Sequence, residues 1–189
     1  MSGAKNSLLV ALAAVCVAAG APVGAHMMAR HDPMVGGAAM YPSKNIIQNA
    51  VKSKDHTTLV AAVKAAGLVD TLSGPGPFTV FAPTNEAFAR LPAGTVATLV
   101  KPENKATLVK ILTYHVVSGT MTATDLKAAI RSGHGTATLT TVEGEPLKVT
   151  MAGGHLILHD AKGGAARITI ANVMQSNGVI HVVDRVLMP

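Results

Sequence analysis

The sequence predicts an α+β fold, because apolar residues recur at helical spacing up to residue 131 and alternate as in strands after residue 136. A second observation is that all 3 phenylalanines lie in one stretch, residues 76–92, of a chain with no tryptophan and 2 tyrosines. A third is size, since residues 43–189 suffice for one hydrophobic core and 49% of the chain is hydrophobic. We therefore expect a single α+β domain organised around this phenylalanine stretch.

The first 25 residues have the pattern of a secretory signal peptide. Lys5 precedes an apolar run over residues 8–19, and small residues up to Ala25 follow it. The run is short for a membrane span, which needs about 20 apolar residues. The single cysteine, Cys16, follows Val15 where a lipidation signal would have a small residue, so a lipid anchor is not favoured. We expect cleavage after Ala25, a secreted or periplasmic protein, and no integral membrane span thereafter.

Residues 26–42 form a leader rich in methionine and histidine, without a sustained period. We expect the leader to be extended or mobile, or to be fastened onto a groove of the domain, because methionine adapts to irregular surfaces. The alternative is a copper or other small-ligand site, since thioether and imidazole groups suit copper. The residues available for that site are His26, Met27, Met28, His31 and Met34.

The domain is expected to begin with two helices. Ser43 is a candidate N-cap for a helix over residues 45–51. A second helix is expected over residues 58–66, with Gly67 as its left-handed terminator. A glycine- and proline-containing turn then leads into the phenylalanine stretch.

The phenylalanine stretch predicts a strand, a tight corner and a short helix. Its first half is β-branched and aromatic, and Pro83 ends the strand because it lacks a backbone donor. Thr84 or Asn85 can cap the helix that follows. We expect the rings of Phe81 and Phe88 to be buried.

Further helices and a set of hairpins complete the predicted domain. Helical pieces are expected over residues 96–100, 104–113 and 125–131, the last capped by Thr124 or Asp125. The expected strands, separated by turns that contain glycine, are residues 138–142, 146–151, 155–159, 167–173 and 179–187.

Three ordered motifs resemble those of the fasciclin domain: the phenylalanine stretch, the Tyr-His pair within residues 112–116, and the closing segment 177–187. The resemblance covers residues 43–189 and implies N-terminal helices packed on a β-wedge of antiparallel and mixed strands. The residues that it assigns to the structural motif are Phe78, Phe81, Pro83, Thr84, Phe88, Asn177, Gly178, His181 and Asp184.

The resemblance also implies a function. Fasciclin domains are extracellular modules associated with cell adhesion and with matrix or surface interactions, and their Tyr-His region is linked to receptor binding in animal members. Tyr114 and His115 match that motif and are therefore the candidate interaction residues. Their apolar neighbours favour a structural role in packing over an interactive one.

The charges are scattered and the histidines are not clustered. A formal net charge of +6 without a basic stripe or stacking aromatics does not favour nucleic-acid binding and supports only a weak preference for acidic surfaces. His155 and His159 lie in a predicted strand, where four residues at ~3.3 Å each separate them by about 13 Å, too far to share one ion. His115 and His181 have β-branched neighbours and should be buried, with Asp184 or a backbone carbonyl as a partner.

No catalytic or cofactor-binding motif is visible in the sequence, neither a Gly-x-Ser-x-Gly elbow, a His-Glu-x-x-His pair, a phosphate loop nor a dinucleotide fingerprint. The leading hypothesis is a secreted, non-enzymatic adhesion module without a cofactor, which binds a surface or matrix protein or glycan. The alternative is a periplasmic protein that binds copper or a small ligand through its leader.

Overall fold

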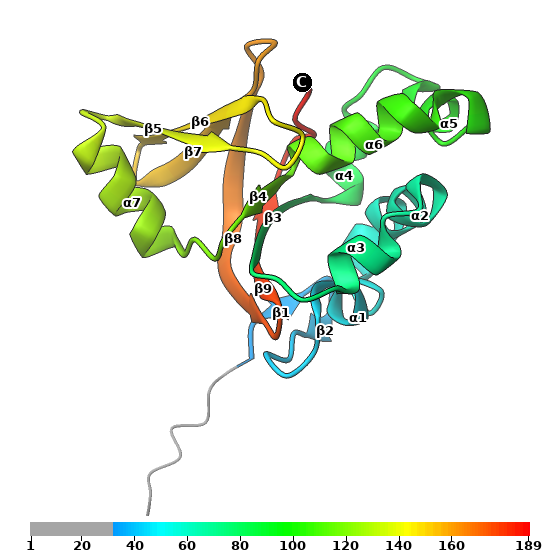
Figure 1. Ribbon diagram of the computed structural model, residues 1–189, viewed down its shortest axis with the longest axis horizontal. Coiled ribbons are helices and arrows are strands. Elements are labelled where there is room, and N and C mark those ends of the chain that lie inside the picture. Colours follow the sequence, from blue (N-terminus) through cyan, green and yellow to red (C-terminus); the bar gives the residue numbers. More distant parts are fainter. Residues whose placement is uncertain (1–31) are drawn as a thin grey trace, which may run out of the picture. The chain divides into compact units, whose positions relative to one another are not determined.

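A mixed seven-stranded sheet forms the centre of the protein in the computed structural model, which describes residues 32–189 (Figure 1). Its strands are β3 (Phe78–Pro83), β4 (Val116–Ser118), β5 (Thr136–Thr140), β6 (Pro146–Ala152), β7 (His155–His159), β8 (Ala165–Gln175) and β9 (Gly178–Val183). They are ordered β4-β3-β9-β8-β7-β6-β5, with β3 and β9 parallel and the other neighbours antiparallel. A bridge between Val117 and Thr141 joins the end strands, so the sheet nearly closes on itself.

The helices pack against this sheet in two separate groups. They are α1 (Ile46–Ala50), α2 (Thr57–Ala66), α3 (Val69–Ser73), α4 (Asn85–Ala89), α5 (Thr95–Leu99), α6 (Lys105–Tyr114) and α7 (Ala123–Ser132), with 3₁₀ turns η1 (Lys54–His56) and η2 (Pro102–Asn104). Figure 1 shows α1 to α6 gathered beside β3 and β9, whereas α7 lies apart from them and packs against β5 and β6. The predicted α+β fold, with helices on a wedge of mixed and antiparallel strands, is confirmed.

Strand β3 separates two hydrophobic cores, because successive side chains of a strand point to opposite faces. Val80 and Ala82 belong to the helical core, which the buried faces of α1 to α4 and α6 complete. Phe81 belongs to the wedge core, which is filled by side chains of α7 and of strands β5 to β9. The phenylalanine stretch is therefore shared by both cores, with Phe88 of α4 on the helical side.

A small hairpin of β1 (Met34–Val35) and β2 (Ala38–Ala39) precedes the helices. Val35 and Met40 are buried in the helical core, so the second half of the predicted leader packs against the domain, in part through methionine as expected. Gly36 accepts a backbone hydrogen bond from Lys54 at 3.2 Å, and its φ of +57° is one that glycine adopts easily.

Two helix caps differ from the prediction. The first helix is capped by Asn45 rather than Ser43, because the Asn45 side chain accepts from the Gln48 N–H and the Gln48 side chain accepts from the Asn45 N–H in return. The last helix starts earlier than predicted and is capped by Thr122, which forms the same reciprocal arrangement with Asp125. At α4 the cap is Thr84, whose hydroxyl accepts from Ala87 N–H at 3.2 Å.

The ends of some strands also differ from the predicted bounds. The final strand was expected to run to residue 187 but ends at Val183, because the next residue, Asp184, bonds to the backbone of Arg167 and the chain bends there. Strand β8 is longer than predicted, with irregular pairing near Asn172, whose φ is +60°. The strand expected over residues 138–142 is β5 at Thr136–Thr140.

Candidate functional site

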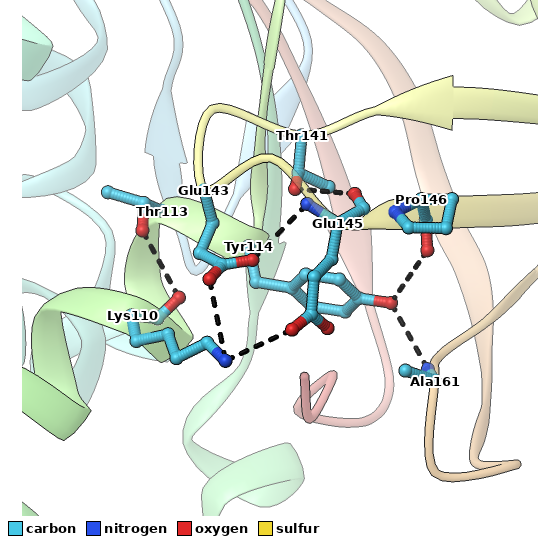
Figure 2. Close-up of polar contacts among 8 residues, drawn as sticks. All are labelled: Lys110, Thr113, Tyr114, Thr141, Glu143, Glu145, Pro146 and Ala161. Atoms are coloured by element: carbon cyan, nitrogen blue, oxygen red, sulfur yellow. Dashed lines mark hydrogen bonds and ion pairs between the residues drawn. The ribbon is translucent and has the colours of Figure 1, made fainter.

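Tyr114 ends α6 and its ring is fully buried in the wedge core. The hydroxyl donates to the carbonyl of Pro146 at the start of β6, at 3.1 Å, and accepts from the N–H of Ala161 between β7 and β8, also at 3.1 Å (Figure 2). Burial raises the pKa of Tyr114, so the hydroxyl keeps the proton that it donates. The side chain thus connects the end of a helix to two parts of the sheet.

His115 follows as the C-cap of α6 and is also buried. Its Nδ1 lies 2.8 Å from the carbonyl oxygen of Ile111, and its Nε2 accepts from the N–H of Leu187 at 2.9 Å. A carbonyl only accepts and an amide N–H only donates, so the neutral ring carries its proton on Nδ1. Burial lowers the pKa of His115 to about 4, which keeps this tautomer uncharged near neutral pH.

The C-terminal segment, residues 184–189, is held by a second acceptor besides His115. Oδ2 of Asp160 accepts from the N–H of Met188 at 3.1 Å. The other oxygen of this carboxylate accepts from the N–H groups of Lys162 and Gly164, at 3.0 and 2.6 Å. Asp160 thereby joins the β7–β8 loop, residues 160–164, to the C-terminal segment.

Together these contacts define the clasp, formed by Tyr114, His115 and Asp160. It ties α6, the β7–β8 loop and the C-terminal segment to one another. Every ring nitrogen and hydroxyl of the Tyr-His pair is used in these bonds, and both rings lie inside the protein. The geometry therefore favours the structural role over direct contact with a partner.

Charged side chains cover the surface beside Tyr114 (Figure 2). The ammonium of Lys110 lies 3.0 Å from a carboxylate oxygen of Glu145 and 3.5 Å from one of Glu143. The hydrogen bond that Lys110 donates to Glu145 is the main reason that the pKa of Lys110 is raised. Salt bridges at the surface contribute little stability. These two link Glu143 and Glu145, between β5 and β6, to α6.

An open cleft of about 340 Å³ lies where the clasp holds the β7–β8 loop and the C-terminal segment. Its walls are that loop with Ala165, the end of α4 and residues 185–188. The cleft is lined by Ala87, Arg90, Leu91, Asp160, Lys162, Gly164, Ala165, Arg185, Val186, Leu187 and Met188. Its volume is within the range of small ligand sites.

The closing signature connects the start of β9 to the helices α1 and α3 and lies close to β3. The side chain of Asn177 accepts from Ile46 N–H at 3.1 Å and donates to the carbonyls of Leu72 and Gly74, at 2.8 and 3.0 Å. A Cβ on Gly178 would lie 2.0 Å from the carbonyl oxygen of Phe78, so only glycine fits there.

His181 lies on β9 and its ring stacks on Phe81, with ring centres 5.7 Å apart. Its Nε2 lies 2.8 Å from the Met121 carbonyl oxygen, and its Nδ1 accepts from Asn172 N–H at 3.4 Å. The partner of this histidine is thus a backbone carbonyl rather than Asp184. The Asp184 carboxylate instead accepts from Arg167 N–H at 2.8 Å, because Asp184 lies beyond the end of the strand.

Sequence reasoning missed the buried role of His56, which lies at the end of η1 with 3% of its surface exposed. Its Nδ1 is 2.8 Å from the Ser53 hydroxyl, but its Nε2 has no hydrogen-bond partner among residues 32–189. Burial lowers its pKa, an effect that the Ala82 backbone and the Asp55 carboxylate partly oppose. The ring borders a cavity of about 30 Å³ that Val35 and Met40 also line. No local pattern signals this burial, because the residues around the cavity come from separate segments of the chain.

Within the described part of the chain, no three His, Cys, Asp or Glu side chains lie close enough together to hold a metal ion. His155 and His159 lie on β7 as expected, and His159 bonds to the Thr150 hydroxyl at 2.8 Å. Met34, on β1, is 55% exposed. The other residues of the predicted copper site (His26, Met27, Met28 and His31), the predicted signal peptide and Cys16 lie outside the described residues. Residues 32–189 contain no helix with the length and apolar character of a membrane span.

The nearly closed mixed sheet, the helices beside β3 and the buried Tyr-His pair define an α+β domain of the wedge type. The family model described as "Fasciclin domain" matches residues 54–189, and the chain belongs to this family.

Relatives include Protein sll1483 of Synechocystis sp., which is 49% identical over 156 residues, covering 82% of this chain and 79% of that protein. The cell surface glycolipoprotein MPB83 of Mycobacterium bovis is 33% identical over 158 residues, covering 84% of this chain and 61% of that protein. A solved structure, a FAS1 domain pair from the insect cell adhesion molecule fasciclin I, has the same fold. Its TM-score is 0.69 at 18% identity, covering 77% of this chain and 51% of that one.

Proposed function

We propose that the protein is a secreted, non-enzymatic interaction module that binds a protein or glycan at the cell surface or in the extracellular matrix. Membership of the fasciclin family supports this proposal. Two similar proteins also support it: MPB83 is a cell surface glycolipoprotein, and the insect protein with the same fold is a cell adhesion molecule. Export would follow from the predicted signal peptide, with cleavage after Ala25.

The observation that carries the proposal is the position of the clasp under an open cleft. Tyr114 and His115 are buried, yet they bond to Ala161 and Leu187, which belong to the two segments that form the cleft's walls. The Tyr-His pair would therefore support a binding surface without touching the partner.

Binding to intact cells or envelope extract tests the proposed function. The secreted chain, labelled and without its signal peptide, should bind in a saturable way and be displaced by unlabelled protein. Linear, unsaturable uptake that unlabelled protein does not displace would remove the basis for the proposal. Mass spectrometry of the exported protein tests the location, since an intact Met1 on protein outside the cell would contradict cleavage.

The role of the Tyr-His pair is tested by Tyr114→Phe, which keeps the ring and removes the hydroxyl. Because Pro146 and Ala161 each lose a partner, we expect a loss of about 1 to 3 kcal/mol in the free energy of unfolding. Envelope binding measured well below the melting temperature should remain. A variant that melts like the parent but no longer binds would show that the hydroxyl acts at the interface.

A further inference from the structure

The cleft beside the clasp has an excess of positive charge at its rim. Arg90, Lys162 and Arg185 line it and are exposed. Lys162 and Arg185 form no ion pair with any residue that the structure describes, and Arg90 has only a long contact of 3.9 Å with Asp184. These cations are therefore free to bind an anionic partner at little cost in broken contacts.

One carboxylate also lines the cleft, but its oxygens are already used. Asp160 accepts hydrogen bonds from three backbone N–H groups, those of Lys162, Gly164 and Met188. Its charge is partly compensated by these donors and its position is fixed. The three basic side chains therefore set the sign of the electrostatic potential at the rim.

The apolar part of the cleft surface is aliphatic. It comes from Leu91, Val186 and Met188, and none of the lining residues in the described part of the chain is aromatic. Sugar rings are commonly bound against aromatic faces, which this cleft lacks. An aliphatic amino-acid side chain fits such a surface better, and arginine clusters are a common means of recognising acidic peptide motifs.

From this combination of charge and shape we infer that the cleft binds an acidic segment of a partner protein. An aliphatic side chain of that segment lies against Leu91 and Met188, and its carboxylates pair with Arg90, Lys162 and Arg185. The inference rests on the proposed function and names the class of partner.

The clasp makes the cleft a preformed site. Ala161, Leu187 and Met188 in its two walls are bonded to Tyr114, His115 and Asp160, respectively. Since the walls need not become ordered on binding, less conformational entropy is lost when a peptide enters.

Fluorescence anisotropy with a labelled peptide of alternating glutamate and leucine tests the inference on the full secreted chain. We expect binding that weakens as salt is added, and a matched peptide with glutamine in place of glutamate should not bind. Arg185→Gln or Lys162→Gln should each weaken binding about tenfold, which corresponds to about 1.4 kcal/mol. Arg131→Gln removes the same charge from an exposed site on α7, outside the cleft, and should change the affinity less than about twofold.

Three results would overturn the inference: no binding of the acidic peptide, equal losses for Arg185→Gln and Arg131→Gln, or displacement of the peptide by an oligouronate that binds more tightly with the same dependence on Arg185. Envelope binding by the same variants separates this inference from the proposed function. Parent and Arg185→Gln proteins that bind envelope equally would exclude the cleft and leave the proposed function standing. Peptide binding without any envelope binding would support the assignment of the cleft and contradict the proposed function.

Discussion

The two cores on either side of β3 differ in how they treat polar groups. In the wedge core, the Tyr114 hydroxyl has two partners and both ring nitrogens of His181 are bonded. In the helical core, His56 has one unbonded nitrogen beside a cavity of about 30 Å³. Unpaired buried polar atoms and voids both cost free energy. The wedge core is therefore better satisfied in its hydrogen bonds and better packed than the helical core.

The difference follows from what closes each core. The wedge core is filled mainly by hairpin strands that are near one another in sequence, from β5 to β8. In the helical core, the cavity beside His56 is lined by side chains from separate segments, among them Val35 and Met40, which precede the match to the family model.

The largest expected effect comes from Phe81→Ala. The ring is fully buried and stacks on His181, so its removal should reduce the free energy of unfolding by about 3 to 5 kcal/mol. Phe88→Ala should fall at the lower end of that range, since the Phe88 ring is 8% exposed and its site can relax. Denaturant titrations measure both variants. Losses below about 1 kcal/mol in both would mean that neither ring anchors its core.

The next largest expected effect is a dependence of the free energy of unfolding on pH. The pKa of His115 is about 4 in the folded protein, against an ordinary 6.5, so between these values the unfolded chain binds more protons. Stability should therefore be complete above pH ~6.5 and fall as the pH decreases towards ~4, by about 3 kcal/mol from this residue. His56 and His181, whose pKa values are also lowered by burial, add losses of the same sign.

Denaturant titrations at a series of pH values, on the parent and on His115→Gln, isolate this contribution. The variant should lose less stability than the parent between pH ~6.5 and ~4, because one titrating group is absent. Parallel curves for the two proteins would show that His115 keeps an ordinary pKa.

A matched pair of leucine substitutions compares the two buried histidines directly. His115→Leu leaves the Ile111 carbonyl and the Leu187 N–H without partners, so we expect a loss of about 2 to 4 kcal/mol. His56→Leu removes one nitrogen that has no partner and leaves only the Ser53 hydroxyl without one, so the loss should be smaller, about 1 to 2 kcal/mol. Thermal melts at neutral pH rank the pair. The opposite order would mean that a partner satisfies His56 in solution.

The smallest effects come from adding one methylene to each core. Val80 borders the cavity of the helical core, so Val80→Ile should be neutral or stabilising by up to about 0.8 kcal/mol. Val149 is fully buried in the wedge core, where the same change should cost about 1 to 3 kcal/mol. The measurement is the shift of the denaturant midpoint of each variant relative to the parent protein. Equal losses would show that the helical core has no usable space.

The fold could be predicted because its signals are local. The structure retains the switch of periodicity near residue 136 and the end of a buried strand at Pro83. Helix caps were harder to predict, because several neighbouring polar residues could serve as the N-cap. Only the reciprocal hydrogen bonds with Gln48 and Asp125 select Asn45 and Thr122.

The site was only partly predictable. The sequence indicated Tyr114 and His115 and their apolar surroundings, but not that His115 binds the backbone of Leu187, which lies 72 residues away. The basic residues of the cleft come from separate segments, and nothing in their local sequence brings Arg90 near Arg185. These features depend on tertiary packing, which periodicity does not record.

Strand β9 lies between β3 and β8, so a strand late in the sequence occupies an interior place in the sheet. During synthesis, β3 must wait for its parallel neighbour until residues 178–183 have left the ribosome, and pairing over such a separation is slow. The nascent chain therefore stays without its complete sheet throughout translation. A chain in that condition would be open enough to be threaded through an export channel, as the proposed secretion requires.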